Sequence, residues 1–155
     1  MEAQNGGTFM RLWHIDLIPY LPKSQLLAQW RELNSIYAKQ DKHILINYIY
    51  NYPKEFLKTY SDGVIIEMKR RHIKIREMAK YNIFFKDVKT VDSATYPEHN
   101  REYLKICYYN LMEKYMRGQK DYSKEEWDNL YKYYSKIKDE FYLGGRNNDD
   151  QRVFR

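Results

Sequence analysis

The sequence predicts an all-α protein: a compact single-domain helical bundle of three to four main helices behind an irregular N-terminal lead-in. Apolar residues recur at helical spacing in several long segments, and helix-start signals stand in front of three of them. At 155 residues the chain is long enough to bury a core as one domain. It contains no internal repeat and no linker that would divide it.

The first main helix is expected at residues 23–39. Apolar side chains recur there at the i, i+4, i+7, i+11 spacing of one helical face, which indicates a buried stripe. These residues are Leu26, Trp30, Leu33 and Tyr37. Residues 10–22 precede this helix and include Pro19 and Pro22. The two prolines favour an extended or irregular segment over a helix.

The second helix is expected to begin at Pro53, because proline suits a first helical turn, and to end at about His72. Asp62 and Gly63 interrupt its middle, which predicts a kink or a close helix contact. Apolar and polar residues alternate only weakly over residues 82–93, so this segment is expected to be either a short strand or a long loop.

The third and fourth helices follow from start signals and apolar faces. The third is expected to begin near Pro97, and its buried face consists of Leu104, Cys107, Leu111 and Tyr115. Ser123 and Glu126 have capping-box spacing and predict the start of the fourth helix, which continues through Ile137. We therefore divide the chain into a flexible extension (1–9), a folded domain (10–143) and a polar tail (144–155).

The composition indicates an acidic partner. The net charge is +6 and 17 residues are tyrosine, a side chain that combines a stacking face with a polar tip. A basic protein of this kind attracts nucleic acid or anionic lipid. No apolar run approaches a membrane span and no signal peptide opens the chain, so we expect a soluble, cytoplasmic protein without membrane contact.

Several kinds of chemistry find no support in the sequence. Cys107 is the one cysteine, which excludes an internal disulfide and a cysteine-rich zinc site, and its apolar surroundings suit the core better than a nucleophile. The four histidines form no ligand-spaced pair, and no phosphate-binding glycine loop is present. We expect neither a metal nor a cofactor.

Two basic or charged segments are candidates for function. Arg31 and Glu32 stand side by side at the edge of the first helix's apolar stripe, where they suit either a site for an anionic substrate or an ordinary surface ion pair. Residues 69–86 contain seven Lys or Arg against one acid and form the densest cationic run.

The last helix alternates tyrosines with lysines over residues 130–136. Stacking faces beside cations suit unpaired or distorted nucleic acid. In the other interpretation Leu130, Tyr131 and Tyr134 are core residues and the lysines a solvated face.

Six short motifs occur in an order that resembles a known family. They are the Leu-x-Ala-x-aromatic-Arg-Glu-Leu run ending at Leu33, Lys42-His43, Glu55-Phe56-Leu57, Lys69-Arg70, Glu113-Lys114, and Tyr131-Lys132-Tyr133-Tyr134. The chain resembles the pyrimidine dimer DNA glycosylases, the phage-type endonuclease V family, from Met10 to about Lys136. Within that family it is similar to bacterial members that begin with a sequence like Met10-Arg11-Leu12-Trp13-His14.

The resemblance implies a compact helical enzyme of base excision repair. Such an enzyme cuts the glycosidic bond at a cyclobutane pyrimidine dimer in duplex DNA and then nicks the strand by β-elimination, as a monomer without metal or cofactor. The family's nucleophile is the α-amine of the residue after the initiator methionine, which forms an imine with the sugar. An α-amine is suited to this task because about a tenth of it is neutral at pH 7, far more than of a lysine.

The resemblance also implies roles for individual residues. Glu32 falls on the catalytic glutamate, Arg31 on an arginine that holds a phosphate, and Arg11 on the position of the amine. The expected DNA-binding residues are Lys42, His43, Lys114, Tyr131, Lys132, Tyr133, Tyr134 and Lys136.

The chain departs from the family pattern at its start and at three contact positions. Arg11 follows Met10 where a small residue is expected, so either the amine of Met10 serves or the nucleophile lies elsewhere; residues 1–9, if retained, would leave no α-amine there. Basic or histidine residues of the phage enzyme are replaced by Gln25, Ser35 and Asn110. A noncatalytic DNA-binding relative and an RNA or protein interaction module therefore remain as alternatives.

Overall fold

The computed structural model describes residues 11–118 and 122–144 of the chain. Its elements, in order, are the 3-10 helix η2 (Ile15–Tyr20), α1 (Lys23–Lys39), the 3-10 helix η3 (Asn47–Asn51), α2 (Lys54–Arg70), α3 (Ala79–Phe84), α4 (Arg101–Met116) and α5 (Lys124–Gly144). The described residues contain no strand, and four of their helices are longer than six residues. The predicted all-α bundle of three to four main helices is thus confirmed.

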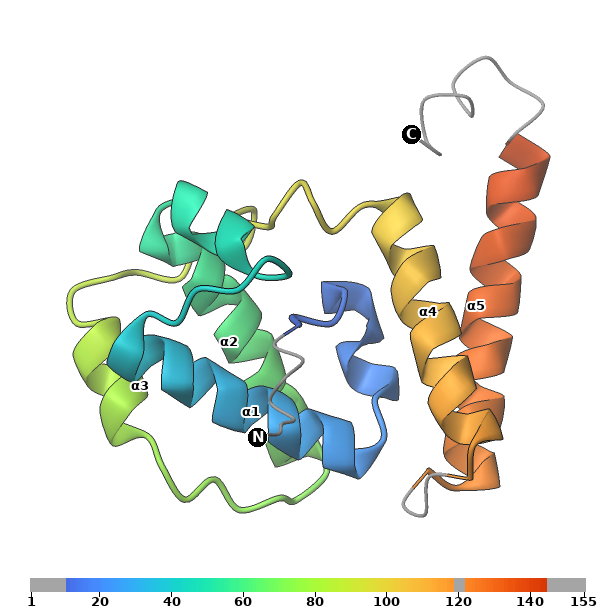
Figure 1. Ribbon diagram of the computed structural model, residues 1–155, viewed down its shortest axis with the longest axis horizontal. Coiled ribbons are helices and arrows are strands. Elements are labelled where there is room, and N and C mark those ends of the chain that lie inside the picture. Colours follow the sequence, from blue (N-terminus) through green and yellow to red (C-terminus); the bar gives the residue numbers. More distant parts are fainter. Residues whose placement is uncertain (1–10, 119–121, 145–155) are drawn as a thin grey trace.

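The helices form two groups with the lead-in between them (Figure 1). α1 packs against α2 and α3, and α4 packs against α5 as an antiparallel pair. η2 contacts α2, α4 and α5, so the lead-in joins both groups through its buried side chains. No helix in this part of the chain is long and apolar enough to cross a membrane.

α1 has the bounds that its spacing predicts, Lys23–Lys39. The predicted face is buried: Leu26, Trp30, Leu33 and Tyr37 all belong to the core. Gln40 ends the helix in the left-handed conformation at φ 51°, where its backbone N–H donates to the Ile36 carbonyl.

The lead-in is helical over six residues, so the prediction of a segment without helix is wrong there. η2 begins because the His14 ring nitrogen Nδ1 accepts from the Asp16 backbone N–H at 3.1 Å. Leu17 and Ile18 then point into the core. Pro19 lies inside this short 3-10 helix and contributes no N–H to its hydrogen bonds.

α2 begins one residue after Pro53, which is its N-cap, and ends at Arg70, two residues before the expected His72. It continues through Asp62 and Gly63 without a break. A Cβ placed on Gly63 would lie 3.6 Å from Ile18 Cδ1, so this glycine marks contact with η2.

Residues 82–93 are the end of α3 followed by loop and turn, and the strand interpretation is wrong. The Asp62 carboxylate holds this segment against α2: it accepts from the Tyr81 hydroxyl at 2.5 Å and from the Thr90 hydroxyl at 2.9 Å. These partners lie far from Asp62 in the sequence, which explains why periodicity did not find them.

The last two helices begin at side-chain caps. The Asn100 side chain accepts from the Tyr103 N–H, so α4 starts at Arg101, later than the predicted Pro97. The predicted capping box is confirmed, because the Ser123 hydroxyl accepts from the Glu126 N–H at 3.1 Å and the Glu126 carboxylate accepts from the Ser123 N–H at 3.0 Å.

α5 continues beyond Ile137 to Gly144, the first residue of the expected tail. The predicted extension at 1–9, Met10, and tail residues 145–155 lie outside the described residues.

Candidate active site

Glu32 is the most unusual carboxylate in the described part of the chain. Its side chain is half-buried, and its Oε2 atom is buried without a hydrogen-bond partner among the described residues. Burial raises the pKa of Glu32 to about 8, although a hydrogen bond from the Arg11 backbone N–H and the charge of Arg31 both favour the ionised form. A carboxyl with such a pKa fits acid-base chemistry near neutral pH.

Arg11 presents its main chain, not its guanidinium, to this carboxylate. Its backbone N–H donates to Glu32. The guanidinium turns into the protein, with Cζ 5.7 Å from the centre of the Trp13 ring and 5.9 Å from that of Tyr103. These cation-π contacts fix the side chain and so hold the position-11 nitrogen beside Glu32.

Gln29 fixes the same segment from α1, one turn before Glu32. Its Oε1 accepts from the Trp13 N–H at 2.9 Å, and its Nε2 donates to the Arg11 carbonyl at 3.0 Å. The Tyr60 hydroxyl donates to the Trp13 carbonyl at 2.6 Å and lies 3.0 Å from the same Oε1. Gln29 is buried and hydrogen-bonded at both Oε1 and Nε2. One helix, α1, therefore positions both Glu32 and the N-terminal segment that lies against it.

Two further side chains hold the lead-in from α4 and the turn before it. The Tyr103 hydroxyl donates to the Leu12 carbonyl at 2.6 Å, and His99 Nδ1 accepts from the Ile15 N–H at 3.1 Å. Burial, with the charge of nearby His14, lowers the pKa of His99 to about 3, so its ring is neutral. Since Nδ1 accepts, the ring proton is on Nε2, 2.6 Å from the Tyr48 hydroxyl oxygen.

The buried Glu32 predicts a measurable pH dependence of stability. Its pKa rises from 4.5 to about 8 on folding, so between these values the folded protein binds more protons than the unfolded chain. This contribution is fully present below pH 4.5 and is lost as the pH rises through 8, at up to about 1.4 kcal/mol per pH unit. Glu32→Gln should therefore become more stable relative to the native protein as the pH rises, as measured by urea unfolding at several pH values. If the free energies of unfolding of the two proteins change in parallel with pH, the raised pKa of Glu32 is contradicted.

Arg31 and Glu32 do not make the surface pair that one interpretation expected. Arg31 is exposed, whereas Glu32 keeps one oxygen in the interior. Arg31 instead lines a shallow groove on the outer side of α1 with Ser35, Lys39 and Lys80. Its position suits an anion bound at the surface close to Glu32.

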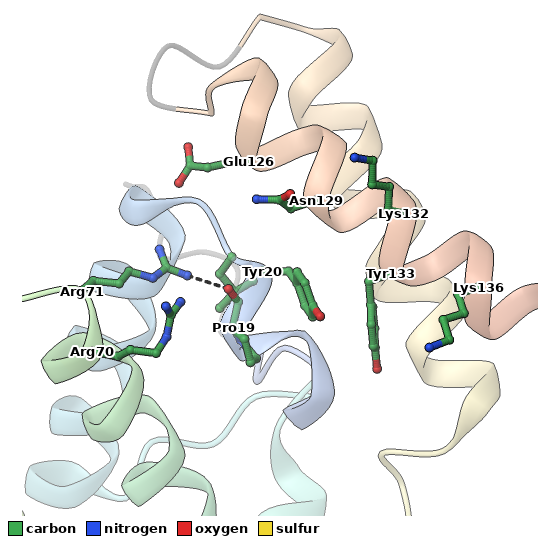
Figure 2. Close-up of a pocket in the computed structure, with 10 residues that line it drawn as sticks. Pro19, Tyr20, Arg70, Arg71, Glu126, Asn129, Lys132, Tyr133 and Lys136 are labelled. Carbon is green, nitrogen blue, oxygen red and sulfur yellow. Dashed lines mark hydrogen bonds between the residues drawn. The ribbon is translucent and has the colours of Figure 1, made fainter.

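A second feature is a basic cleft of about 670 Å³ between the lead-in, the end of α2 and α5 (Figure 2). We call it the α5 cleft. It is lined by Pro19, Tyr20, Leu21, Arg70, Arg71, Glu126, Asn129, Lys132, Tyr133 and Lys136. The cleft thus brings three predicted DNA-binding residues, Lys132, Tyr133 and Lys136, together with Arg70 and Arg71 of the cationic run.

The tyrosines of α5 divide between core and surface. Tyr134 is buried and stacks on Tyr108 at 3.8 Å between ring centres, as the core interpretation expects. Tyr131 is 54% exposed, so that interpretation is wrong for it. Tyr133 is half-buried and stacks on Tyr20 at 4.4 Å in the α5 cleft.

The remaining predicted DNA-binding residues do not line the α5 cleft. Lys42 and His43 follow the C-terminal end of α1. The Lys42 ammonium lies 5.6 Å from the centre of the Tyr50 ring, and His43 Nδ1 accepts from the Leu45 N–H at 3.2 Å. Lys114 is half-buried near the end of α4. The roles of these three residues in binding DNA stay predictions.

Cys107 is completely buried, and burial raises the pKa of its thiol, as suits a core residue. The described residues include no group of three or more His, Cys, Asp or Glu side chains that could hold a metal ion.

Comparison with known protein families gives one match. The family model of the pyrimidine dimer DNA glycosylases matches residues 10–81. This match confirms the family resemblance. It spans just under half of the chain and includes Arg11, Gln29, Arg31 and Glu32. It ends before α4, so Lys114 and the tyrosine-lysine segment of α5 lie outside it. No curated protein and no solved structure matches the chain.

Proposed function

We propose that this protein is a DNA glycosylase with abasic-site lyase activity that acts at pyrimidine dimers in duplex DNA. One observation carries the proposal: the backbone nitrogen of Arg11 hydrogen-bonds to the half-buried Glu32 carboxylate. If the chain begins at this residue, the same nitrogen is an α-amine, the nucleophile of the family. Glu32 then lies within reach of the sugar that the amine attacks.

The chemistry follows from these two groups. The neutral amine attacks C1′ of the damaged nucleotide, and the bond from C1′ to the base nitrogen breaks with its electrons going to the base. The proton lost by the amine goes to the base nitrogen. The sugar ring then opens as the protonated Glu32 carboxyl gives its proton to O4′, and a cationic imine forms at C1′. Glu32 is left ionised by this transfer, and its carboxylate stabilises the positive charge of the imine.

Glu32 can also carry the proton in the second step. Removal of a C2′ proton by its carboxylate pushes electrons toward the imine, and the C3′–O bond breaks as the 3′ phosphate leaves. This β-elimination nicks the strand, and water then hydrolyses the imine to release the enzyme. Because the pKa of Glu32 is about 8, its carboxyl both accepts and returns a proton readily near neutral pH.

The position of Glu32 suits a nucleotide that has left the base stack of the DNA duplex. Such an enzyme must reach the sugar from outside the base stack, so the duplex is expected to bend and a nucleotide to leave the stack. Arg31 is exposed on the adjacent position of α1, where it can hold a phosphate beside the reacting sugar. We propose a monomer that needs no metal or cofactor.

A nicking assay with the chain that begins at Arg11 tests the proposed function. A labelled duplex with one cyclobutane pyrimidine dimer should be cut at the dimer and leave a β-elimination end, whereas the undamaged duplex of the same sequence should stay intact. Binding without nicking would instead favour a noncatalytic DNA-binding relative. Equal, weak binding of both duplexes would favour an interaction module.

A further inference from the structure

An ionised carboxylate orients two arginines at the end of α2. Glu67 is buried, and it accepts from Arg70 Nε at 2.9 Å, from Arg70 Nη2 at 2.5 Å and from Arg71 Nε at 2.6 Å. Burial alone would raise the pKa of Glu67, but these hydrogen bonds and charges lower it, so the group stays ionised. Both guanidinium groups are therefore fixed in orientation.

The fixed arginines form one wall of the α5 cleft. Arg71 Nη2 donates to the Pro19 carbonyl at 3.1 Å, which attaches the end of α2 to the lead-in. Arg70 has a side chain that is 63% exposed and uses Nε and Nη2 for Glu67. Its Nη1 remains to donate to a ligand, and Figure 2 shows both arginines on the side of the cleft opposite α5.

The other wall comes from α5. Lys132 and Lys136 lie one helical turn apart, and both line the cleft (Figure 2). Tyr133 lies between them in sequence and stacks on Tyr20 of the lead-in with an interplanar angle of 21°. The stacked rings fix the wall, and Figure 2 shows Lys132 and Lys136 on either side of Tyr133 along α5.

We propose that the α5 cleft binds the phosphate backbone of duplex DNA, at a site separate from Glu32. This inference rests on the proposed function, which makes DNA the substrate, and adds Arg70 and Arg71 to the binding surface. Four cations on two walls face one acidic lining residue, Glu126, since Glu67 lies behind the arginines. An open cleft with cations on both sides suits a chain of phosphates, and arginine held in a fixed plane suits phosphate geometry.

Salt dependence of DNA binding tests the cleft without any chemistry. Affinity for an undamaged labelled duplex is measured by fluorescence anisotropy over a range of salt concentrations. The double variant Lys132→Gln/Lys136→Gln should reduce the slope of log affinity against log salt by about 1.8, because each phosphate contact contributes about 0.9. Arg70→Gln alone should reduce it by about 0.9.

A matched double variant controls for net charge. Lys124→Gln/Lys138→Gln removes the same charge from the same helix, outside the cleft, and should leave the slope nearly unchanged. Equal slopes for the two double variants would overturn the proposal, and so would a slope loss seen with single-stranded DNA but not with duplex. Circular dichroism confirms that each variant is folded before its slope is compared.

The outcome is independent of the enzymatic activity. If the 11–155 protein nicks dimer-containing DNA while both double variants have equal slopes, the cleft proposal alone fails. If the cleft variants lose slope while the 11–155 protein does not nick, the cleft stands and the catalytic proposal fails.

Discussion

Glu32→Gln is expected to lower the rate of strand cleavage at abasic sites and dimers at least about 100-fold, with little change in DNA affinity. The substitution keeps the shape of the side chain but removes the negative charge that stabilises the imine and the base that takes the C2′ proton. Single-turnover nicking and anisotropy on the same duplex measure the two effects separately.

A second carboxylate provides the control. Glu113 is exposed on α4 and pairs with Arg117 at 3.2 Å, so Glu113→Gln removes the same charge away from the site and should cleave at the native rate. Cleavage by Glu32→Gln at the native rate would remove this residue from the mechanism. A parallel loss in both variants would point to overall charge instead.

The first residue of the chain should also control activity. We compare chains that span residues 1–155, 10–155 and 11–155, the last released from a cleavable tag. Activity should rise as the start approaches position 11, because only there does the α-amine take the place of the nitrogen that contacts Glu32. An amine on Met10 would lie farther away by up to one residue, about 3.8 Å.

Borohydride trapping on an abasic duplex measures this order directly. The nitrogen of residue 11 is an amide, and not a nucleophile, in the longest chain, whereas in the shortest chain it is an α-amine of which about a tenth is neutral at pH 7. We expect at least about a tenfold gain in trapped adduct from the longest to the shortest chain. Blocking the amine of the 11–155 chain by acetylation is the control and should abolish trapping. If the longest chain is trapped as well as the shortest, the terminal-amine hypothesis fails.

Local signals account for what the sequence predicted well. α1 begins and ends where its apolar spacing places it, and Ser123 and Glu126 form the expected capping box. Both depend on residues a few positions apart, so no knowledge of the tertiary fold is needed. The short helices η3 and α3 carry no such signal, and the sequence did not reveal them.

The parts of the site that sequence reasoning missed depend on distant contacts. Gln29 could have been suspected as a polar residue within an apolar face, but its partners at positions 11, 13 and 60 come from other segments. His99 and Tyr103 reach the lead-in from more than 80 residues away. No periodicity encodes such pairs.

The α5 cleft shows the same limit for charged residues. Arg70 and Arg71 stood out only as members of a cationic run, and Lys132 and Lys136 only as members of a tyrosine-lysine segment. The fold brings these four residues together in the α5 cleft, whereas Lys42 follows the C-terminal end of α1 and lies outside the cleft. Counting charges along the chain cannot distinguish these outcomes.

The central claim is that a terminal amine beside Glu32 forms an imine with the sugar. The most direct measurement is borohydride trapping of the 11–155 chain on an abasic duplex, followed by peptide mapping of the adduct by mass spectrometry. The claim predicts one covalent adduct on the α-nitrogen of Arg11. An adduct on a lysine side chain, or none from a protein that still binds the duplex, would contradict it.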